Sequence, residues 1–318
     1  MKMISVVIPC YNEENSVELM HDKLTNIFRE QLPNYSYEII FVDDFSTDST
    51  REIIERVCLS DSNAKAVFNA ANFGFHRNVF ECFRYASGDA VFMIFGDMQE
   101  PPEMLPQFVE KWEQGYKCVV GQSNNHGEKL PMRICRRLYY WVMNTLSQAR
   151  FIPMMNGFGL YDRCFVDAIM DIDETSPFFK AVVAEYGSRV AIVPYEHAVS
   201  LRKKSNFNFA KNYDFAMHGL THASKVLMRV ATFLSLLVAI PTVIFGLFVF
   251  IKKLLFWDSY PIGLAAITVG VFFLGSVQLF FLSIVGEYVL SANERAAKKP
   301  RVIVERYINM DTEGNIRT

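Results

Sequence analysis

The sequence predicts an α/β domain built on a mostly parallel sheet with flanking helices, followed by a C-terminal two-helix transmembrane hairpin. In the first 200 residues, short β-rich runs alternate with helical patterns, which is typical of such a sheet. Two later stretches, 230–251 and 262–285, contain no charged residue. They are 22 and 24 residues long, enough for a helix to cross a bilayer.

The elements of the α/β domain follow in order along the chain. The expected strands are 4–8, 38–42, 65–68, 90–95, 117–120 and 190–193. The expected helices are 15–30, 49–59, 77–86, 104–114 and 132–147. Ser49 and Glu52 have the spacing of a capping box, which predicts a helix start at this point. Ligands of such sheets bind beyond the carboxyl ends of the strands, so functional residues are expected there.

The sequence predicts that the chain is anchored in a membrane and consists of six parts. The expected parts are a cytoplasmic domain (1–205), an amphipathic juxtamembrane helix (206–229), a first span (230–251), a loop (252–261), a second span (262–285) and a cytoplasmic tail (286–318). Basic residues gather before the first span and after the second, so both termini should be cytoplasmic. No apolar signal region follows Met1, which favours a cytoplasmic or inner-membrane protein. The alternative for 206–229 is an ordinary core helix.

Composition excludes several classes of protein. The apolar content of 51% and charged content of 21% exclude disorder. The formal net charge of −2 gives no global basic field, so nucleic acid is not expected as a partner. Six scattered cysteines without a close pair favour a reducing compartment over a disulfide framework or a zinc site.

The ends of the predicted strands carry polar residues of a distinctive kind. The first strand leads into Pro9-Cys10-Tyr11-Asn12-Glu13-Glu14, which is neither a dinucleotide-binding nor a P-loop motif. Asp43-Asp44 ends the second strand, and Gly96-Asp97-Met98-Gln99-Glu100 follows the fourth. Carboxylates accept hydrogen bonds from a base or ribose and hold Mg²⁺ on a diphosphate, while an aromatic ring stacks on a base. These ends suit a nucleotide diphosphate, but Asp also serves in caps and turns.

Together, these segments resemble family 2 glycosyltransferases of the GT-A (Rossmann-like) fold, especially the polyprenyl-phosphate group of dolichol-phosphate mannosyltransferases and bactoprenol glucosyltransferases. The resemblance is carried in order by 7–14, 38–48, 72–74, 96–103, 157–163, 229–234 and 286–288. It implies inverting transfer of a sugar from a nucleotide diphosphate sugar, first of all a UDP-sugar, to a membrane polyprenyl phosphate such as undecaprenyl phosphate. The product would be a lipid-linked monosaccharide. The resemblance also makes a homo-oligomer plausible.

The resemblance assigns roles to individual residues. It implies a nucleotide pocket formed by Pro9, Tyr11, Glu13, Val42, Asp44 and Gly96. It implies that Asp97, the expected catalytic residue, and Gln99 hold Mg²⁺ or Mn²⁺ on the diphosphate. The acceptor phosphate needs cations close to the membrane, and the candidates are Arg133, Arg136, Arg137, Arg202 and Lys203. For any single one of these, a solvated basic face is the alternative. Glu100 is either an assisting acid or a first-turn helix charge.

The chain departs from the family pattern at several positions. Phe95 stands where the family's D-x-D begins with Asp, and Asn156-Gly157-Phe158-Gly159 replaces a Gly-Asp-Phe-Arg segment. A polyprenyl monophosphate is largely ionised at neutral pH, so its attack needs no general base. The losses leave a second hypothesis, a catalytically weakened, membrane-anchored nucleotide-sugar-binding protein. A processive polysaccharide synthase is disfavoured because the chain has no Gln-x-x-Arg-Trp motif.

Overall fold

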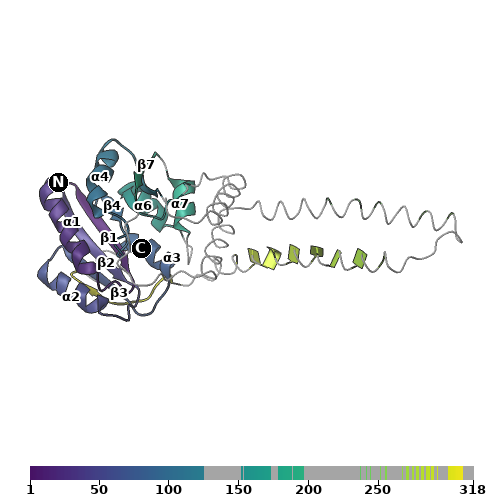
Figure 1. The fold of residues 1–318 in the computed structure, drawn as a ribbon, viewed down its shortest axis with the longest axis horizontal. Coiled ribbons are helices and arrows are strands. Elements are labelled where there is room, and N and C mark those ends of the chain that lie inside the picture. The colour runs from purple at the N-terminus through teal and green to yellow at the C-terminus, as the bar shows by residue number, and fades with distance from the viewer. Residues whose placement is uncertain are drawn as a thin grey trace.

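The computed structural model is an α/β domain whose central sheet has helices on both faces (Figure 1). It describes residues 1–124, 152, 154–172, 178–187, 189–196 and 300–310, and scattered positions between 237 and 292. The predicted helices 132–147 and 206–229 therefore lie outside the described residues, and the two predicted spans are described only at scattered positions.

The described strands form one eight-stranded sheet in the order β7-β5-β6-β4-β1-β2-β3-β8. Their bounds are β1 Met3–Cys10, β2 Ser36–Asp43, β3 Ala64–Asn69, β4 Ala90–Met93, β5 Cys118–Ser123, β6 Gly159–Asp162, β7 Val190–Tyr195 and β8 Val304–Ile308. Strands β4, β1, β2 and β3 are mutually parallel, as are β5 and β7. Strand β6 runs antiparallel between β4 and β5, and β8 runs antiparallel along β3. The mostly parallel sheet is therefore confirmed.

Helices α1 to α4 lie close to the positions that the sequence predicts for them. They are α1 Val17–Gln31, α2 Thr50–Ser60, α3 Phe75–Glu81, α4 Leu105–Glu113, α6 Arg163–Met170 and α7 Phe179–Tyr186. Short 3₁₀ turns extend α3 at its end (Cys82–Tyr85) and precede α4 (Pro102–Met104). The sequence did not predict α6, α7, β6 or β8, and the expected strand 90–95 ends at Met93.

The predicted capping box at α2 is wrong. Ser49 occupies the N-cap, but its side chain makes no capping hydrogen bond. Its φ and ψ of −75° and 7° are not the extended conformation that aims an N-cap side chain at the helix. Asp48 Oδ1 instead accepts hydrogen bonds from the backbone N and the hydroxyl of Thr50.

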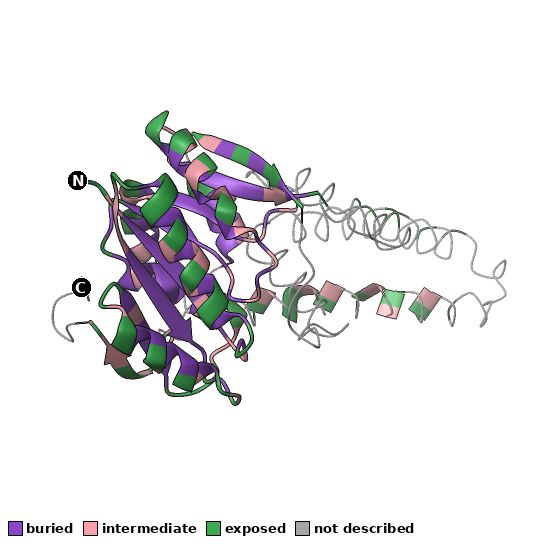
Figure 2. Cartoon of the chain, turned by 60° about the vertical axis from the view of Figure 1, so that its left-hand side comes forward, coloured by how far each residue is buried: buried purple, intermediate pink, exposed green. Residues whose placement is uncertain are grey.

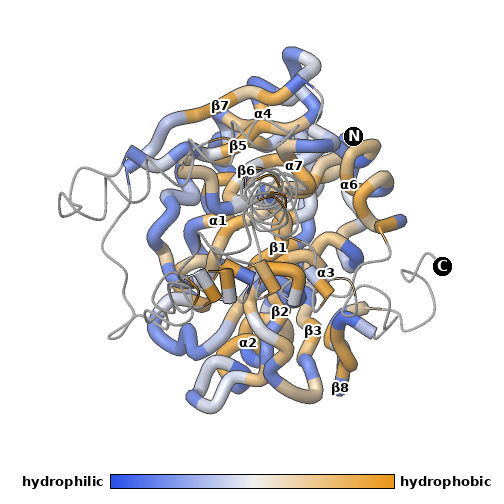
Figure 3. The backbone as a smooth tube through the Cα atoms, turned by 90° about the vertical axis from the view of Figure 1, so that its right-hand side faces the viewer, coloured by the Kyte–Doolittle hydropathy of each residue, from blue (hydrophilic) through white to orange (hydrophobic). Residues whose placement is uncertain are grey.

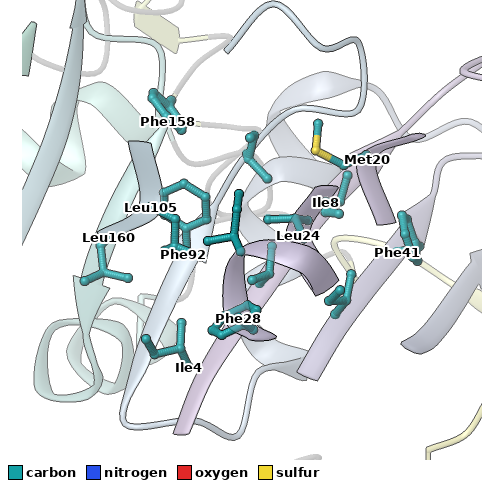
Figure 4. Packing of buried hydrophobic residues seen from close by; sticks show 14 of the residues in the cluster. Ile4, Ile8, Met20, Leu24, Phe28, Phe41, Phe92, Leu105, Phe158 and Leu160 are labelled. Atoms are coloured by element: carbon teal, nitrogen blue, oxygen red, sulfur yellow. The ribbon is translucent and has the colours of Figure 1, made fainter. Parts of the chain in front are cut away.

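The hydrophobic core consists of two layers, one on each face of the sheet. Because successive strand residues point to opposite faces, Val6 belongs to one layer and Val7 to the other. In the first layer, Met20, Leu24 and Phe28 of α1 pack on β1 (Figure 4). The central strands are accordingly buried while helix surfaces stay exposed (Figure 2). The core strands are mostly hydrophobic, with hydrophilic segments toward the periphery (Figure 3).

The described part of the chain also bears on the predicted hairpin. Among the described residues, no helix combines the length and the hydropathy needed to cross a membrane. At scattered helical positions within the predicted spans, large apolar side chains are exposed, among them Ile244, Ile251, Ile267, Val271 and Leu282.

Candidate functional site

Three hydrogen bonds join the end of β1 and the loop that follows it to the loop that follows β2. The backbone N of Asp44 donates to the carbonyl of Cys10 (3.0 Å), and the backbone N of Asn12 donates to Ser46 Oγ (2.8 Å). Thr47 N returns a bond to Asn12 Oδ1 (2.8 Å). The loop after the first strand is thus held directly against the loop that begins at Asp44.

The loop after β4 reaches the same place because Gly96 has no side chain. A Cβ at Gly96 would lie 3.3 Å from Cys10 Sγ and from Glu13 Cγ, and 3.5 Å from the Pro9 carbonyl. The two distances of 3.3 Å are tighter than nine in ten real Cβ contacts, whereas 3.5 Å is ordinary van der Waals contact. Gly96 therefore lets the Asp97 loop pack on the first loop, and three of the predicted pocket residues, Pro9, Glu13 and Gly96, come together.

Each of these loops contains one non-glycine residue with a left-handed backbone. The φ angles are +57° at Asn12, +63° at Phe45 and +59° at Met98. Asn tolerates this region, whereas Phe and Met in it are strained by on the order of 1–3 kcal/mol each. Such conformations persist only where surrounding contacts hold them, so the edge formed by these loops is rigidly built.

The predicted nucleotide residues differ in how much surface they offer. Pro9 and Tyr11 are partly buried, and Glu13 is almost fully buried. Val42 is fully buried within the core layer, so its side chain presents no surface to a base. Asp44 is also buried, and its carboxylate accepts bonds from Asn69 Nδ2 (3.0 Å) and from the backbone N of residues 73 and 74 (both 2.9 Å). In this structure Asp44 organises the loop after β3.

Asp97 lies at the exposed side of this junction. It is partly buried, and its Oδ1 accepts a bond from the backbone N of Gln99 (3.2 Å), so both predicted metal ligands lie on one turn. Among the described residues, no three His, Cys, Asp or Glu side chains converge as a metal site. Mg²⁺ is usually held by one or two carboxylates together with substrate phosphates and water, so the single Asp97 carboxylate fits an ion delivered with a diphosphate.

Behind Asp97 lies a buried carboxylic acid, Glu100. Its Oε1 accepts bonds from Asn156 Nδ2 (2.6 Å) and the Tyr195 hydroxyl (3.5 Å), while Oε2 has no hydrogen-bond partner among the described residues. Burial, assisted by the charge of Asp97, raises the pKa of Glu100 to about 8. The 3₁₀ turn begins only at Pro102 and Glu100 is 1% exposed, so the alternative of a first-turn helix charge is wrong.

Asn156 and Tyr195 are site residues that sequence reasoning missed. They are 56 and 95 residues from Glu100, and no local pattern links such positions. Next to Asn156, Gly157 has a φ of +114°, a backbone conformation that favours glycine. The backbone conformation at 157 therefore favours a glycine over an aspartate at this position.

Phe95, the residue at the first D-x-D position, is partly buried and stacks on the exposed Phe75 of α3, with ring centres 5.5 Å apart. An aromatic pair thus replaces a carboxylate beside Asp97. The predicted acceptor-phosphate residues lie outside the described residues: Arg133, Arg136, Arg137, Arg202 and Lys203.

The chain is similar to known proteins along most of its length. Residues 5–187 match the model of the protein family described as Glycosyl transferase family 2. The chain is 31% identical over 303 residues to the bactoprenol glucosyl transferase of Shigella phage SfV, covering 95% of this chain and 98% of that protein. It is 28% identical over 304 residues to the prophage bactoprenol glucosyl transferase homolog of Escherichia coli K12, covering 95% and 98%.

A solved structure shares the fold. The glucosyl-3-phosphoglycerate synthase of Mycobacterium tuberculosis, crystallised with Mn²⁺, UDP and phosphoglyceric acid, superposes with a TM-score of 0.50. The match covers 70% of this chain and 77% of the other at 18% identity. At that identity the likeness concerns the fold alone, and it supports the GT-A-like α/β architecture.

Proposed function

This chain belongs to glycosyl transferase family 2 and is a glycosyltransferase, and on that premise we propose that it transfers a sugar from a nucleotide diphosphate sugar to a membrane polyprenyl phosphate. The donor is a UDP-sugar, and transfer inverts the anomeric carbon. The relatives named bactoprenol glucosyl transferase, which align along nearly their whole length, support a lipid-carrier acceptor.

One observation carries the proposal. Three loops from the carboxyl ends of β1, β2 and β4 meet at one place, and the partly exposed Asp97 carboxylate lies at their junction. Ligands of parallel sheets bind at such an edge. A base and ribose fit beside Pro9 and Tyr11, which keep exposed surface, while the diphosphate lies toward Asp97.

Asp97 and Gln99 would hold the Mg²⁺ or Mn²⁺ that neutralises charge developing on the leaving diphosphate. Asp97 is fixed for this task by its bond with the backbone of Gln99. An ionised phosphate acceptor attacks without losing a proton, so the reaction tolerates the glycine at 157, where the backbone disfavours a side chain.

A membrane position also belongs to this proposal. Exposed apolar side chains on helical residues, such as Ile244 in the first predicted span and Ile267 and Val271 in the second, are unfavourable in water and favourable among lipid chains. They support a two-span hairpin that keeps the enzyme beside an acceptor in the bilayer. The basic residues that flank the two predicted spans support cytoplasmic termini. One of two basic groups, Arg133, Arg136 and Arg137 or Arg202 and Lys203, would receive the acceptor phosphate.

The test is a transfer assay on the full chain in detergent or nanodiscs. It uses Mg²⁺ or Mn²⁺, undecaprenyl phosphate and a panel of labelled UDP-sugars, with lipid-linked monosaccharide as the readout. We expect one donor to give product, and Asp97→Asn to lower kcat by about 10²–10³-fold, the usual effect of removing a transition-state charge stabiliser.

The matched control is Asp167→Asn, which removes an exposed carboxylate of α6 whose ion pair with Arg163 lies on the surface. It should leave turnover unchanged. UDP binding without product for any sugar would overturn the enzyme proposal in favour of a nucleotide-sugar-binding protein. Equal turnover of Asp97→Asn and wild type would remove Asp97 from the mechanism.

A further inference from the structure

The segment 300–310, here called the C-terminal strap, forms the edge of the sheet on the β3 side, next to the candidate site. Its strand β8 pairs antiparallel with β3 and lies beside it in the ribbon (Figure 1). The residues of the strap come from far along the chain, after the second predicted span. Its contacts therefore connect the segment that follows the second predicted span with the loops of the candidate site.

Arg51 of α2 bridges the strap and the end of β2. Its Nη2 lies 2.6 Å from Glu305 Oε2 of β8. Its Nε lies 3.2 Å from Asp43 Oδ2, which makes an ion pair without the geometry of a hydrogen bond. The guanidinium also lies over the ring of Phe68, 5.0 Å from its centre. A planar guanidinium is suited to holding two carboxylates at once in fixed directions, so Glu305 helps to set where Arg51 meets Asp43.

Asp43 depends on this contact because it is fully buried. Its Oδ2 accepts a bond from the backbone N of Ser46 (3.1 Å), and its Oδ1 has no hydrogen-bond partner among the described residues. A buried carboxylate without a countercharge is costly. The Asp43 carboxylate therefore transmits the position of Arg51 to Ser46, whose hydroxyl accepts the Asn12 backbone bond of the first loop.

A second contact joins the strap to the neighbouring loop. The carbonyl of Ile303 accepts a bond from the backbone N of Ala70 (2.8 Å). The adjacent Asn69 donates to Asp44 (3.0 Å), and Asp44 in turn holds the backbone of residues 73 and 74. The strap thus contacts Ala70 directly and reaches Asp43 through Arg51, by a hydrogen bond and by ion pairs that are independent of each other.

We propose that Glu305, acting through Arg51 and Asp43, is a positioning residue that holds the 44–48 loop in the conformation that binds the donor nucleotide. The inference rests on the proposed function, because it takes this edge as the nucleotide site. It adds that the strap following the membrane segment sets the affinity for the donor.

The chain offers a matched control on the same strand. Arg306, the next residue of β8, pairs with Glu55 of α2, so this pair also ties the strap to α2 but does not involve Asp43. Glu305→Gln and Glu55→Gln therefore each remove one ion pair between β8 and α2. Arg51→Lys is a third variant, which keeps the charge but cannot span both carboxylates.

The experiment measures the Kd of UDP with Mn²⁺ by calorimetry on the full chain, together with the thermal unfolding midpoint. The Glu305 carboxylate is exposed, so its ion pair is weak, and Glu305→Gln should raise the Kd of UDP only about three- to fivefold. Arg51→Lys should raise it at least as much. Glu55→Gln should leave the Kd unchanged, with a change in the unfolding midpoint similar to that of Glu305→Gln.

The outcomes separate the two levels of the proposal. If the wild type turns over and Glu305→Gln leaves the Kd of UDP unchanged, the positioning role is overturned and the proposed function is not affected. Equal weakening by Glu305→Gln and Glu55→Gln would also overturn it, because general loosening of the strand would then be the cause. Wild-type protein that binds no UDP would overturn the proposed function and the inference together.

Discussion

Two buried glutamates at opposite ends of the sheet show opposite pKa shifts. Burial alone would raise the pKa of Glu38, but bonds from Lys65, Ser5 and Ser87 lower it below its ordinary value. Glu100 is equally buried, and burial with the nearby Asp97 charge raises its pKa to about 8. The difference comes from donors and from neighbouring charge. Glu38 accepts four hydrogen bonds, one of them from the Lys65 ammonium, whereas Glu100 lies near the Asp97 carboxylate and its Oε2 has no partner among the described residues.

The surroundings of the two ends differ in the same way. A hollow of about 580 Å³ at the amino end is lined by charged side chains that pair with one another, such as Lys2 with Glu113 (2.9 Å) and Lys117 with Asp162 (3.0 Å). The carboxyl end holds strained loops and a carboxylic acid that is only partly satisfied. Polar groups that have hydrogen-bond or ion-pair partners within the protein stabilise the fold. Buried polar groups that lack such partners mark the edge of the sheet where a ligand is expected.

The largest effect that this comparison predicts is the loss of the Glu38 network. Glu38→Gln removes the countercharge of Lys65 and should lower the free energy of unfolding by about 3 kcal/mol at pH 7. Because the folded pKa of Glu38 is lowered, its contribution is present above the unfolded pKa and is lost as pH falls through the folded value. The difference between wild type and variant should therefore shrink on acidification.

Chemical denaturation of the full chain at several pH values measures this difference. Glu18→Gln, at an exposed position in the first turn of α1, is the control and should cost only a few tenths of a kcal/mol. A Glu38→Gln variant no less stable than this control would break the contrast between the two ends of the sheet.

The next effect has the opposite sign. Glu100 keeps its proton in the folded state between about pH 4.5 and 8, while the unfolded chain releases it, so wild-type stability falls as pH rises through this window. Glu100→Gln removes this dependence. At pH 8 the variant should be more stable than wild type by on the order of 3 kcal/mol, and near pH 4.5 the two should be nearly equal.

Denaturation in metal-free buffer tests this prediction, because a cation near Asp97 would change the charge that Glu100 experiences. Glu103→Gln serves as the control, since Glu103 pairs with Lys23 at the surface and its folded pKa is lowered. A stability difference between Glu100→Gln and wild type that stays constant from pH 4.5 to 8 would argue against a protonated buried acid.

The smallest effect concerns the loop that carries Asn156. Gly157→Ala and Gly157→Asp should each lower the free energy of unfolding by about 1–2 kcal/mol, because a φ of +114° strains any residue with a Cβ. Restoring the carboxylate at 157 should therefore not raise kcat in the transfer assay. Higher turnover of Gly157→Asp than of Gly157→Ala would show that the loop accepts a catalytic carboxylate after all.

Much of the fold was predictable because the signals are local. The parallel strands are short apolar runs, and the helices between them show the periodicity of one buried face. The strands that escaped prediction have weaker signals. Strand β6 has only four residues, and the exposed edge strand β8 carries Glu305 and Arg306 instead of an apolar run.

The candidate site divides in the same way. Pro9 lies near the end of β1, whereas Glu13, Gly96 and Asp97 follow strand ends, and the rule for parallel sheets was enough to bring them together. That rule does not reveal exposure: the side chain of Val42 lies in the core, and Asp44 is buried and binds the backbone of residues 73 and 74. Their roles toward base and ribose stay predictions. These assignments depend on neighbours distant in sequence.

The sequence by itself determined the α/β class, the mostly parallel sheet and the edge where chemistry is expected, because these follow from periodicity and strand direction. Only the tertiary structure decided that Glu100 is a buried acid held by Asn156, and that Glu305 reaches Asp43 through Arg51. The physical reason is that burial and ion pairing depend on contacts between distant segments, and those contacts exist only once the sheet has assembled.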